Sequence, residues 1–129
     1  VRGNGGIIIL PSTSLTQVAC GATVWAVDLD KGLAPYNAGD FATALTEWKP
    51  LVEQGNAAAQ YNLALTYDEG EGVIQDNVYA HMWLNIAAAS GSEQARSNKD
   101  ILVKQMTPQV ISKAQDLARE CVKKNYKDC

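Results

Sequence analysis

The only histidine of this 129-residue chain, His81, is the first residue whose type suggests chemistry. A histidine that acts as a general base needs a nucleophile within hydrogen-bond reach. Neither Gly-x-Ser-x-Gly nor Ser-x-x-Lys, two motifs that carry a nucleophilic serine, occurs in the sequence. His81 also lies beside Ala80, which we expect to face a helix interface. A packing or surface histidine is therefore favoured, and the chain is predicted not to be an enzyme.

Four acidic residues lie close together at Asp68, Glu69, Glu71 and Asp76. Calcium prefers such ligands, but their spacing does not match a twelve-residue calcium-binding loop. One histidine and three scattered cysteines give no zinc pattern. A solvated loop between helices is favoured over a metal site, and no cofactor is predicted. Paired carboxylates for sugar hydrolysis would need a deep pocket, which we do not expect between so few helices.

Cys121 and Cys129 lie in a cationic C-terminal segment and are predicted to form a disulfide, with two free thiols as the alternative. In one unbroken helix their Cα atoms would be roughly 12 Å apart. A disulfide accepts only roughly 4.4 to 6.8 Å between them. The helix is therefore expected to end near Asn125. Cys20 is then the odd cysteine, either removed with a leader or left unpaired.

From residue 40 onward, apolar residues recur at intervals of three and four, which is typical of amphipathic helices. Such stripes cover residues 41–52, 80–88 and 110–122. Trp48 and Trp83 belong to these stripes, so we interpret them as core residues and not as platforms for sugars. The sequence therefore predicts an all-α protein.

Helix ends are also marked in the sequence. Asp40 and Asp76 are candidate N-caps, and Thr107 precedes a proline at the first helical position. Gly70 suits a left-handed helix end. Pro35 is expected to interrupt the first helix, because proline has no N–H to donate and crowds the preceding turn.

The predicted helix 57–69 is apolar on two sides, with Ala59, Leu63 and Tyr67 on one face and Tyr61 and Leu65 nearly opposite. A helix of this kind is expected to lie between two layers. Its third face carries polar residues, and Gly55 and Gly91 indicate a repeat of 36 residues. Shifting that face by one repeat gives three more positions, and the predicted binding groove comprises Asn62, Thr66, Glu69, Asn98, Leu102 and Gln105.

The segment 59–91 resembles a Sel1-like repeat, a relative of the tetratricopeptide repeats. The residues that carry the resemblance are Ala59-Gln60-Tyr61-Asn62-Leu63, Tyr67-Asp68-Glu69-Gly70-Glu71-Gly72-Val73, Asp76, Ala80, Trp83, Ala87, Ala88 and Gly91. Residues 29–55 look like a shortened preceding unit, and residues 92–126 like a divergent capping helix pair. The resemblance implies an antiparallel helix-hairpin solenoid, an α/α superhelix of about two repeat units plus the C-terminal cap.

The resemblance also implies a function. The inner surface of the solenoid would bind an unidentified protein or peptide, and the protein would act as a non-catalytic adaptor. Two alternatives remain open. Some secreted cysteine-rich relatives have been ascribed penicillin binding, so a β-lactam-binding or hydrolytic enzyme is one. A self-associating structural protein, such as a homodimer, is the other, because about three repeats are usually needed for a stable stack.

Residues 1–26 differ from the rest and are interpreted as a degenerate secretion signal, followed by a helical repeat domain over 27–129. The apolar run 7–10 is too short to span a bilayer, so no membrane span is predicted. A periplasmic or secreted protein is expected. The net charge of −3 does not suggest nucleic acid as a partner. The charge is divided, with net −7 over residues 28–76 and net +3 over 93–129.

Overall fold

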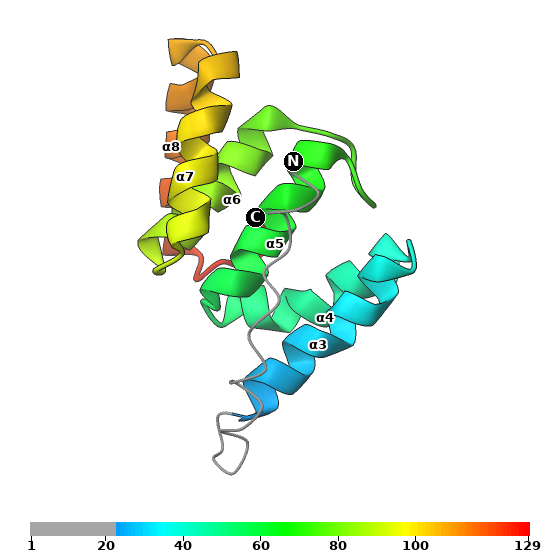
Figure 1. The fold of residues 1–129 in the computed structure, drawn as a ribbon. Helices are drawn as coiled ribbons and strands as arrows, with labels where there is room; N and C mark the ends of the chain where they lie inside the picture. The colour runs from blue at the N-terminus through cyan, green and yellow to red at the C-terminus, as the bar shows by residue number, and fades with distance from the viewer. Residues whose placement is uncertain (1–22) are drawn as a thin grey trace.

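The computed structural model describes residues 23–129, and all regular structure in that part is helical. Figure 1 shows the helices in chain order. They are α3 (Thr23–Asn37), α4 (Phe41–Glu53), α5 (Ala57–Glu69), α6 (Asn77–Ala89), α7 (Glu93–Leu102), the 3-10 helix η2 (Val103–Gln105) and α8 (Pro108–Lys123). The predicted all-α class is confirmed. No helix of the described part has both the length and the apolar character needed to cross a membrane.

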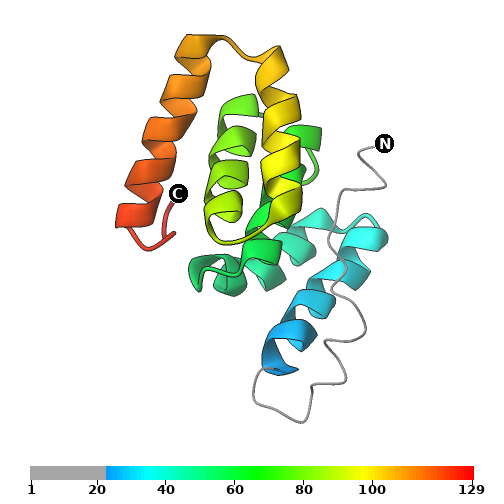
Figure 2. The same cartoon turned by 60° about the vertical axis from the view of Figure 1, so that its left-hand side comes forward.

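The helices are arranged as a short solenoid. The helices α3 and α4 pair as one antiparallel hairpin, α5 and α6 pair as the next, and α4 packs on α5 (Figure 1). The third unit is built differently, because α7 and α8 each pack on α6 more extensively than on each other. Figure 2 shows α6 lying between them. The capping pair therefore straddles the last helix of the solenoid.

Side-chain caps begin the helices where the sequence indicates. Asp40 accepts a hydrogen bond from Thr43 N at the start of α4, and Asp76 accepts from two backbone N–H groups at the start of α6. Thr107 caps α8 in the same way. Each cap satisfies a backbone donor that the first turn leaves without an intrahelical acceptor. The predicted boundaries at these three residues are confirmed.

The turn between α5 and α6 depends on two glycines. Gly70 ends α5 with φ of +72°, the left-handed conformation that glycine adopts without steric cost. Gly72 has φ of +81°, and a Cβ there would lie 2.7 Å from the Cβ of Phe41. A larger residue would push this turn away from α4, so Gly72 sets how closely the two hairpins approach.

The prediction that Pro35 interrupts the first helix is wrong, since α3 continues through Pro35 to Asn37. The proline costs the helix the one backbone hydrogen bond that its missing N–H would make, and α3 ends two residues later. Tyr36 beside it packs on the rings of Phe41 and Trp48, with centroids 5.2 and 5.7 Å away. Packing on α4 therefore keeps this turn helical.

The core runs along the seams between hairpins and contains both tryptophans that the sequence assigned to it. Trp48 donates a hydrogen bond from Nε1 to the carbonyl of Leu29, 3.1 Å away. Trp83 is buried on α6. The first 22 residues of the predicted leader, which include Cys20 and the apolar run 7–10, lie outside the described residues. The helix α3 begins at Thr23, so it crosses the predicted domain boundary after residue 26.

Candidate functional site

A pocket of about 310 Å³ lies on one side of the solenoid. Three consecutive helices, the loop after α5 and the C-terminal segment 124–129 form it. We call it the tail groove. Its lining residues are Leu45, Trp48, Lys49, Val52, Glu53, Leu63, Tyr67, Val73, Trp83, Tyr126, Asp128 and Cys129. Most of these side chains are apolar, so the tail groove can bury apolar groups of a ligand.

The helix α5 contributes the accessible apolar wall of the tail groove. Leu63 and Tyr67 are four residues apart, so they lie one turn apart on the same helix face. Both are half-buried, whereas Trp48 and Trp83 below them are buried. The ring of Tyr67 packs edge-on against Tyr79 of α6, with centroids 5.4 Å apart. A large side chain entering the groove would therefore meet Leu63 and Tyr67 first.

One ion pair lies on the rim of the tail groove. Lys49 contacts Glu53 one turn along α4. The hydrogen bond to Glu53 raises the pKa of Lys49, so its ammonium group stays charged at neutral pH. Asp128 of the C-terminal segment also lines the groove. The mouth thus offers charges of both signs around an apolar floor.

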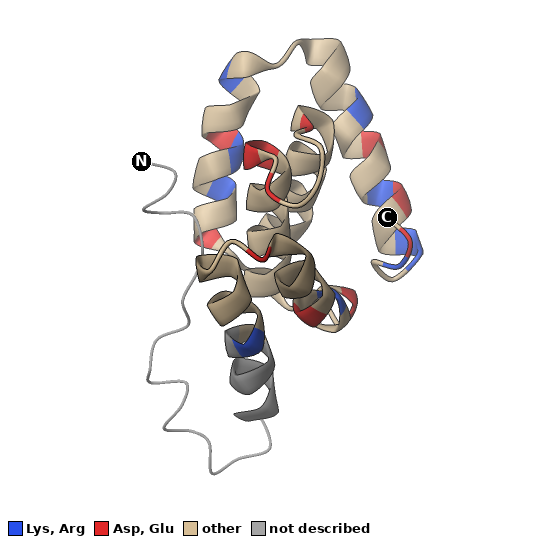
Figure 3. Ribbon diagram, turned by 90° about the vertical axis from the view of Figure 1, so that its right-hand side faces the viewer, with Lys and Arg blue, Asp and Glu red and all other residues tan. Residues whose placement is uncertain are grey.

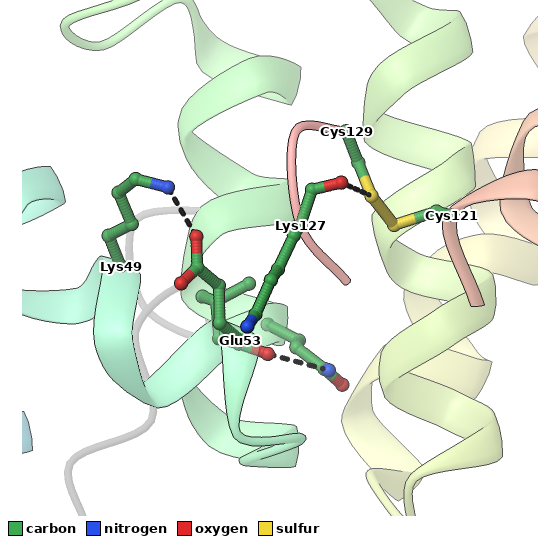
Figure 4. The surroundings of a disulfide bond; sticks show 7 residues. Lys49, Glu53, Cys121, Lys127 and Cys129 are labelled. Atoms are coloured by element: carbon green, nitrogen blue, oxygen red, sulfur yellow. Dashed lines mark hydrogen bonds and ion pairs between the residues drawn. A yellow bond between two sulfur atoms is a disulfide. The ribbon is translucent and has the colours of Figure 1, made fainter. Parts of the chain in front are cut away.

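The far wall of the tail groove is held by a disulfide between Cys121 and Cys129, whose Cα atoms are 5.5 Å apart (Figure 4). The helix α8 ends at Lys123, two residues before the expected position, and the chain then turns back. Asn125 and Tyr126 both have positive φ. This reversal brings the ring of Tyr126 close to Gly55, where an added Cβ would lie 3.5 Å from the ring. The tail therefore spans from α8 to the α4–α5 turn.

The predicted polar binding groove is not formed as expected. Asn62 and Thr66 are fully buried, and Leu102 is buried as well. Glu69 and Asn98 are half-buried, and only Gln105 is exposed. The helix α5 packs on both α4 and α6, so polar residues on it can be covered by its neighbours. The prediction that all six residues line one continuous open groove is therefore wrong.

These polar residues stabilise the interior instead. Thr66 donates a hydrogen bond from Oγ1 to the carbonyl of Leu63, 2.6 Å away. Asn98 on α7 donates from Nδ2 to the hydroxyl oxygen of Tyr61 on α5, 2.7 Å away. This bond links α5 to α7, which otherwise have little contact. Asn98 thus serves an interior contact and not a partner-binding surface.

His81 is placed as a packing residue and not as part of the tail groove. Its side chain is buried, and its Nδ1 has no hydrogen-bond partner among the described residues. Burial, and secondarily the positive charge of Lys99, lower the pKa of His81. The imidazole is therefore neutral at pH 7. It does not line the tail groove.

The acidic residues between α5 and α6 have local structural roles. Glu71 accepts a hydrogen bond from the Tyr36 hydroxyl, 2.5 Å away, and Asp76 caps α6. Burial and this bond to Glu71 raise the pKa of Tyr36, so it stays protonated as a donor. No group of three or more His, Cys, Asp or Glu side chains in the described part could hold a metal ion.

Sequence reasoning missed the tail groove because its residues looked like ordinary core. The sequence predicts Leu63 and Tyr67 on a buried stripe of α5, and the structure places them on the groove wall. Tyr126 belongs to none of the predicted helical stripes. One signal was present, since Tyr126 is an aromatic residue in the otherwise polar run 123–128.

Paired antiparallel helices that stack side by side, with a groove along one side, define a helical-repeat protein of the solenoid class. Residues 57–92, which hold α5 and α6, match the model of the Sel1 repeat family. The chain thus contains a Sel1 repeat, and the resemblance seen in the sequence is confirmed over this segment. Sel1 repeats generally mediate protein–protein interactions. The searches of curated proteins and of solved structures found no significant match.

Proposed function

We propose that this protein is a non-catalytic interaction module that binds a segment of a protein partner in the tail groove. The observation that carries the proposal is the pocket of about 310 Å³ walled by Leu63 and Tyr67, with charged residues at its mouth. Interfaces gain most of their affinity from a few large side chains buried in such pockets. The Sel1 repeat itself supplies α5 and α6, and so supplies this wall.

The shape and chemistry of the tail groove favour a particular kind of segment. A volume of about 310 Å³ accommodates one or two large apolar side chains and not a whole helix. Lys49 and Asp128 at the mouth can pair with charges of either sign that flank the anchor. The preferred ligand is therefore a short segment with an apolar or aromatic anchor between polar residues.

Peptide selection tests this proposal. Peptides selected from a random display library on the wild-type protein should share a large apolar residue. Their affinity should fall about tenfold or more with Leu63→Asp, because a charge is then placed against the buried anchor. Isothermal titration calorimetry with the selected peptides measures the change.

Ser112→Asp is the matched control, since it adds the same charge on the exposed side of α8, outside the tail groove. It should leave peptide affinity unchanged. Circular dichroism should show both variants folded. Equal affinity of the selected peptides for wild type and folded Leu63→Asp would contradict the assignment of the groove.

We further propose that the protein acts in an oxidising compartment, periplasmic or extracellular. Support comes from the position of the Cys121–Cys129 disulfide, which fixes the segment that forms the far wall of the groove. Disulfides persist in such compartments and are rare where thiols are kept reduced. Alkylation of the protein in its native cells, followed by mass measurement, tests this. Two alkylated residues at 121 and 129 without prior reduction would count against it.

A further inference from the structure

A second groove lies on the opposite part of the solenoid, where α6 passes between α7 and α8. Two adjoining hollows, of about 500 and 400 Å³, share Asn85 and Ala89 on α6. The helix α8 forms one wall and α7 the other. We call it the α7–α8 groove. It is separate from the tail groove, with which it shares no lining residue.

The α7–α8 groove has an apolar floor and cationic walls. Ile86 and Ala89 line its floor. Val122 of α8 lines it beside them and is 49% exposed. Four cations line the walls, Arg96, Lys99, Arg119 and Lys123, whereas Asp100 is the single carboxylate of the lining. Three of these cations form exposed ion pairs within their own helix. Exposed ion pairs contribute little energy, so these cations can still pair with another anion. The groove is therefore suited to an acidic segment that carries an apolar residue.

The loop between α5 and α6 has this complementary composition. Ile74 is 89% exposed, the largest exposure among the large apolar residues of the described part. Asp68, Glu69, Glu71 and Asp76 surround it in the sequence, and no Lys or Arg occurs between Lys49 and Arg96. Figure 3 shows acidic residues at this loop and charges of both signs along α7 and α8. An exposed apolar residue within a charged rim is typical of an interaction site.

The loop cannot reach the α7–α8 groove of its own molecule. It precedes Asn77 at the start of α6, whereas Ala89 in the groove is the last residue of that helix. A helix of this length places its ends about 18 Å apart. Figure 1 shows the loop on the right and α7 and α8 on the left of the solenoid. The two complementary surfaces therefore face away from each other and can meet only between molecules.

We propose that the α7–α8 groove binds the α5–α6 loop of a second copy of this chain, with Ile74 against Ala89 and Val122. The carboxylates around Ile74 then lie near the cations of the groove walls. Such a contact joins two different surfaces, so a pair of bound copies leaves one loop and one groove unoccupied. Association is expected to continue head to tail in an open chain. The contact does not depend on the proposed partner binding, although Val73, next to Ile74 in the loop, lines the tail groove.

Complementing variants test the proposal in solution. Wild-type protein should show a weight-average mass that rises with concentration in sedimentation equilibrium, and less so at high salt. Ile74→Glu and Val122→Glu should each weaken self-association about tenfold or more. An equimolar mixture of the two should form dimers of wild-type affinity. In this mixture the Ile74→Glu protein supplies an intact groove, and the Val122→Glu protein supplies an intact loop.

Ile101→Glu is the matched control, because Ile101 is 57% exposed on α7 and does not line the α7–α8 groove. It should associate as the wild type does. Wild-type protein that stays monomeric at every concentration would overturn the proposal. So would a mixture of the two folded variants that associates no better than either variant alone, since a symmetric contact or another surface would then be responsible.

Discussion

The indole of Trp48 lies directly on the backbone of Gly32, so closely that a Cβ added to Gly32 would be 2.1 Å from Trp48 Nε1. This contact joins α3 to α4, and the same indole donates to the Leu29 carbonyl. The first hairpin therefore depends on a residue without a side chain at position 32. Neither helical spacing nor the repeat pattern in the sequence indicated this role.

Gly32→Ala should destabilise the protein. In an open helix the change would stabilise by up to about 1 kcal/mol, because alanine has the higher helix propensity. Here the overlap with Trp48 should dominate, and we expect a net loss of about 1 to 3 kcal/mol in the free energy of unfolding. Urea denaturation followed by circular dichroism measures it. The loss should be smaller in a Trp48→Phe background, which removes the nitrogen that Cβ would meet, and equal losses in both backgrounds would contradict the contact.

Cys129→Ser should release the C-terminal segment from α8. The Cys121–Cys129 bond closes a short loop, and loss of the bond should lower the free energy of unfolding by about 2 to 3 kcal/mol. Thermal unfolding with and without reductant checks this. Reductant should bring the wild type to the stability of the variant and leave the variant unchanged. A wild type that is indifferent to reductant would show that the bond does not contribute.

Asn62→Ala distinguishes the buried role of Asn62 from the binding role predicted from the sequence. Because Asn62 is fully buried, its replacement should cost about 1 to 3 kcal/mol of stability. Peptide affinity of the folded protein should not change, since Asn62 does not line the tail groove. Gln105→Ala is the control at an exposed position, expected to change stability by less than about 0.5 kcal/mol. Loss of peptide affinity with unchanged stability in Asn62→Ala would restore the sequence-based groove.

His81 should make stability depend on pH in the mildly acidic range. Its pKa is lowered in the folded state, so below about pH 6.5 the unfolded chain takes up a proton that the folded chain does not. The free energy of unfolding should therefore fall as pH decreases from 7.5 towards 5.5. His81→Gln cannot take up this proton and should show a flatter profile over the same range. Parallel profiles for the two proteins would argue against burial of the neutral imidazole.

The fold could be predicted from the sequence because its signals are local. The N-caps at Asp40, Asp76 and Thr107 and the glycine at Gly70 mark helix ends through backbone hydrogen bonds and conformation. Such signals do not depend on the rest of the structure. The prediction for Pro35 is wrong because packing of α3 on α4 outweighs a local cost in the last turn.

The site could be predicted less well, for a physical reason that α5 illustrates. Nearly all faces of α5 have neighbours, so polarity does not tell which face is open. Asn62 and Thr66 look like surface residues and are buried, whereas Leu63 and Tyr67 look like core residues and line the tail groove. The groove also needs Tyr126, which reaches the α4–α5 turn only because the chain reverses after α8. Contacts of this range cannot be inferred from spacing.

Chemical-shift mapping of a bound peptide tests the tail groove most directly. On titration of a selected peptide into ¹⁵N-labelled protein, we predict that the backbone amides of Leu45, Leu63, Tyr67 and Tyr126 shift. The side-chain indole signals of Trp48 and Trp83 should shift with them, because both residues line the groove. Shifts confined to α7 and α8, with these six residues unchanged, would contradict the proposed site.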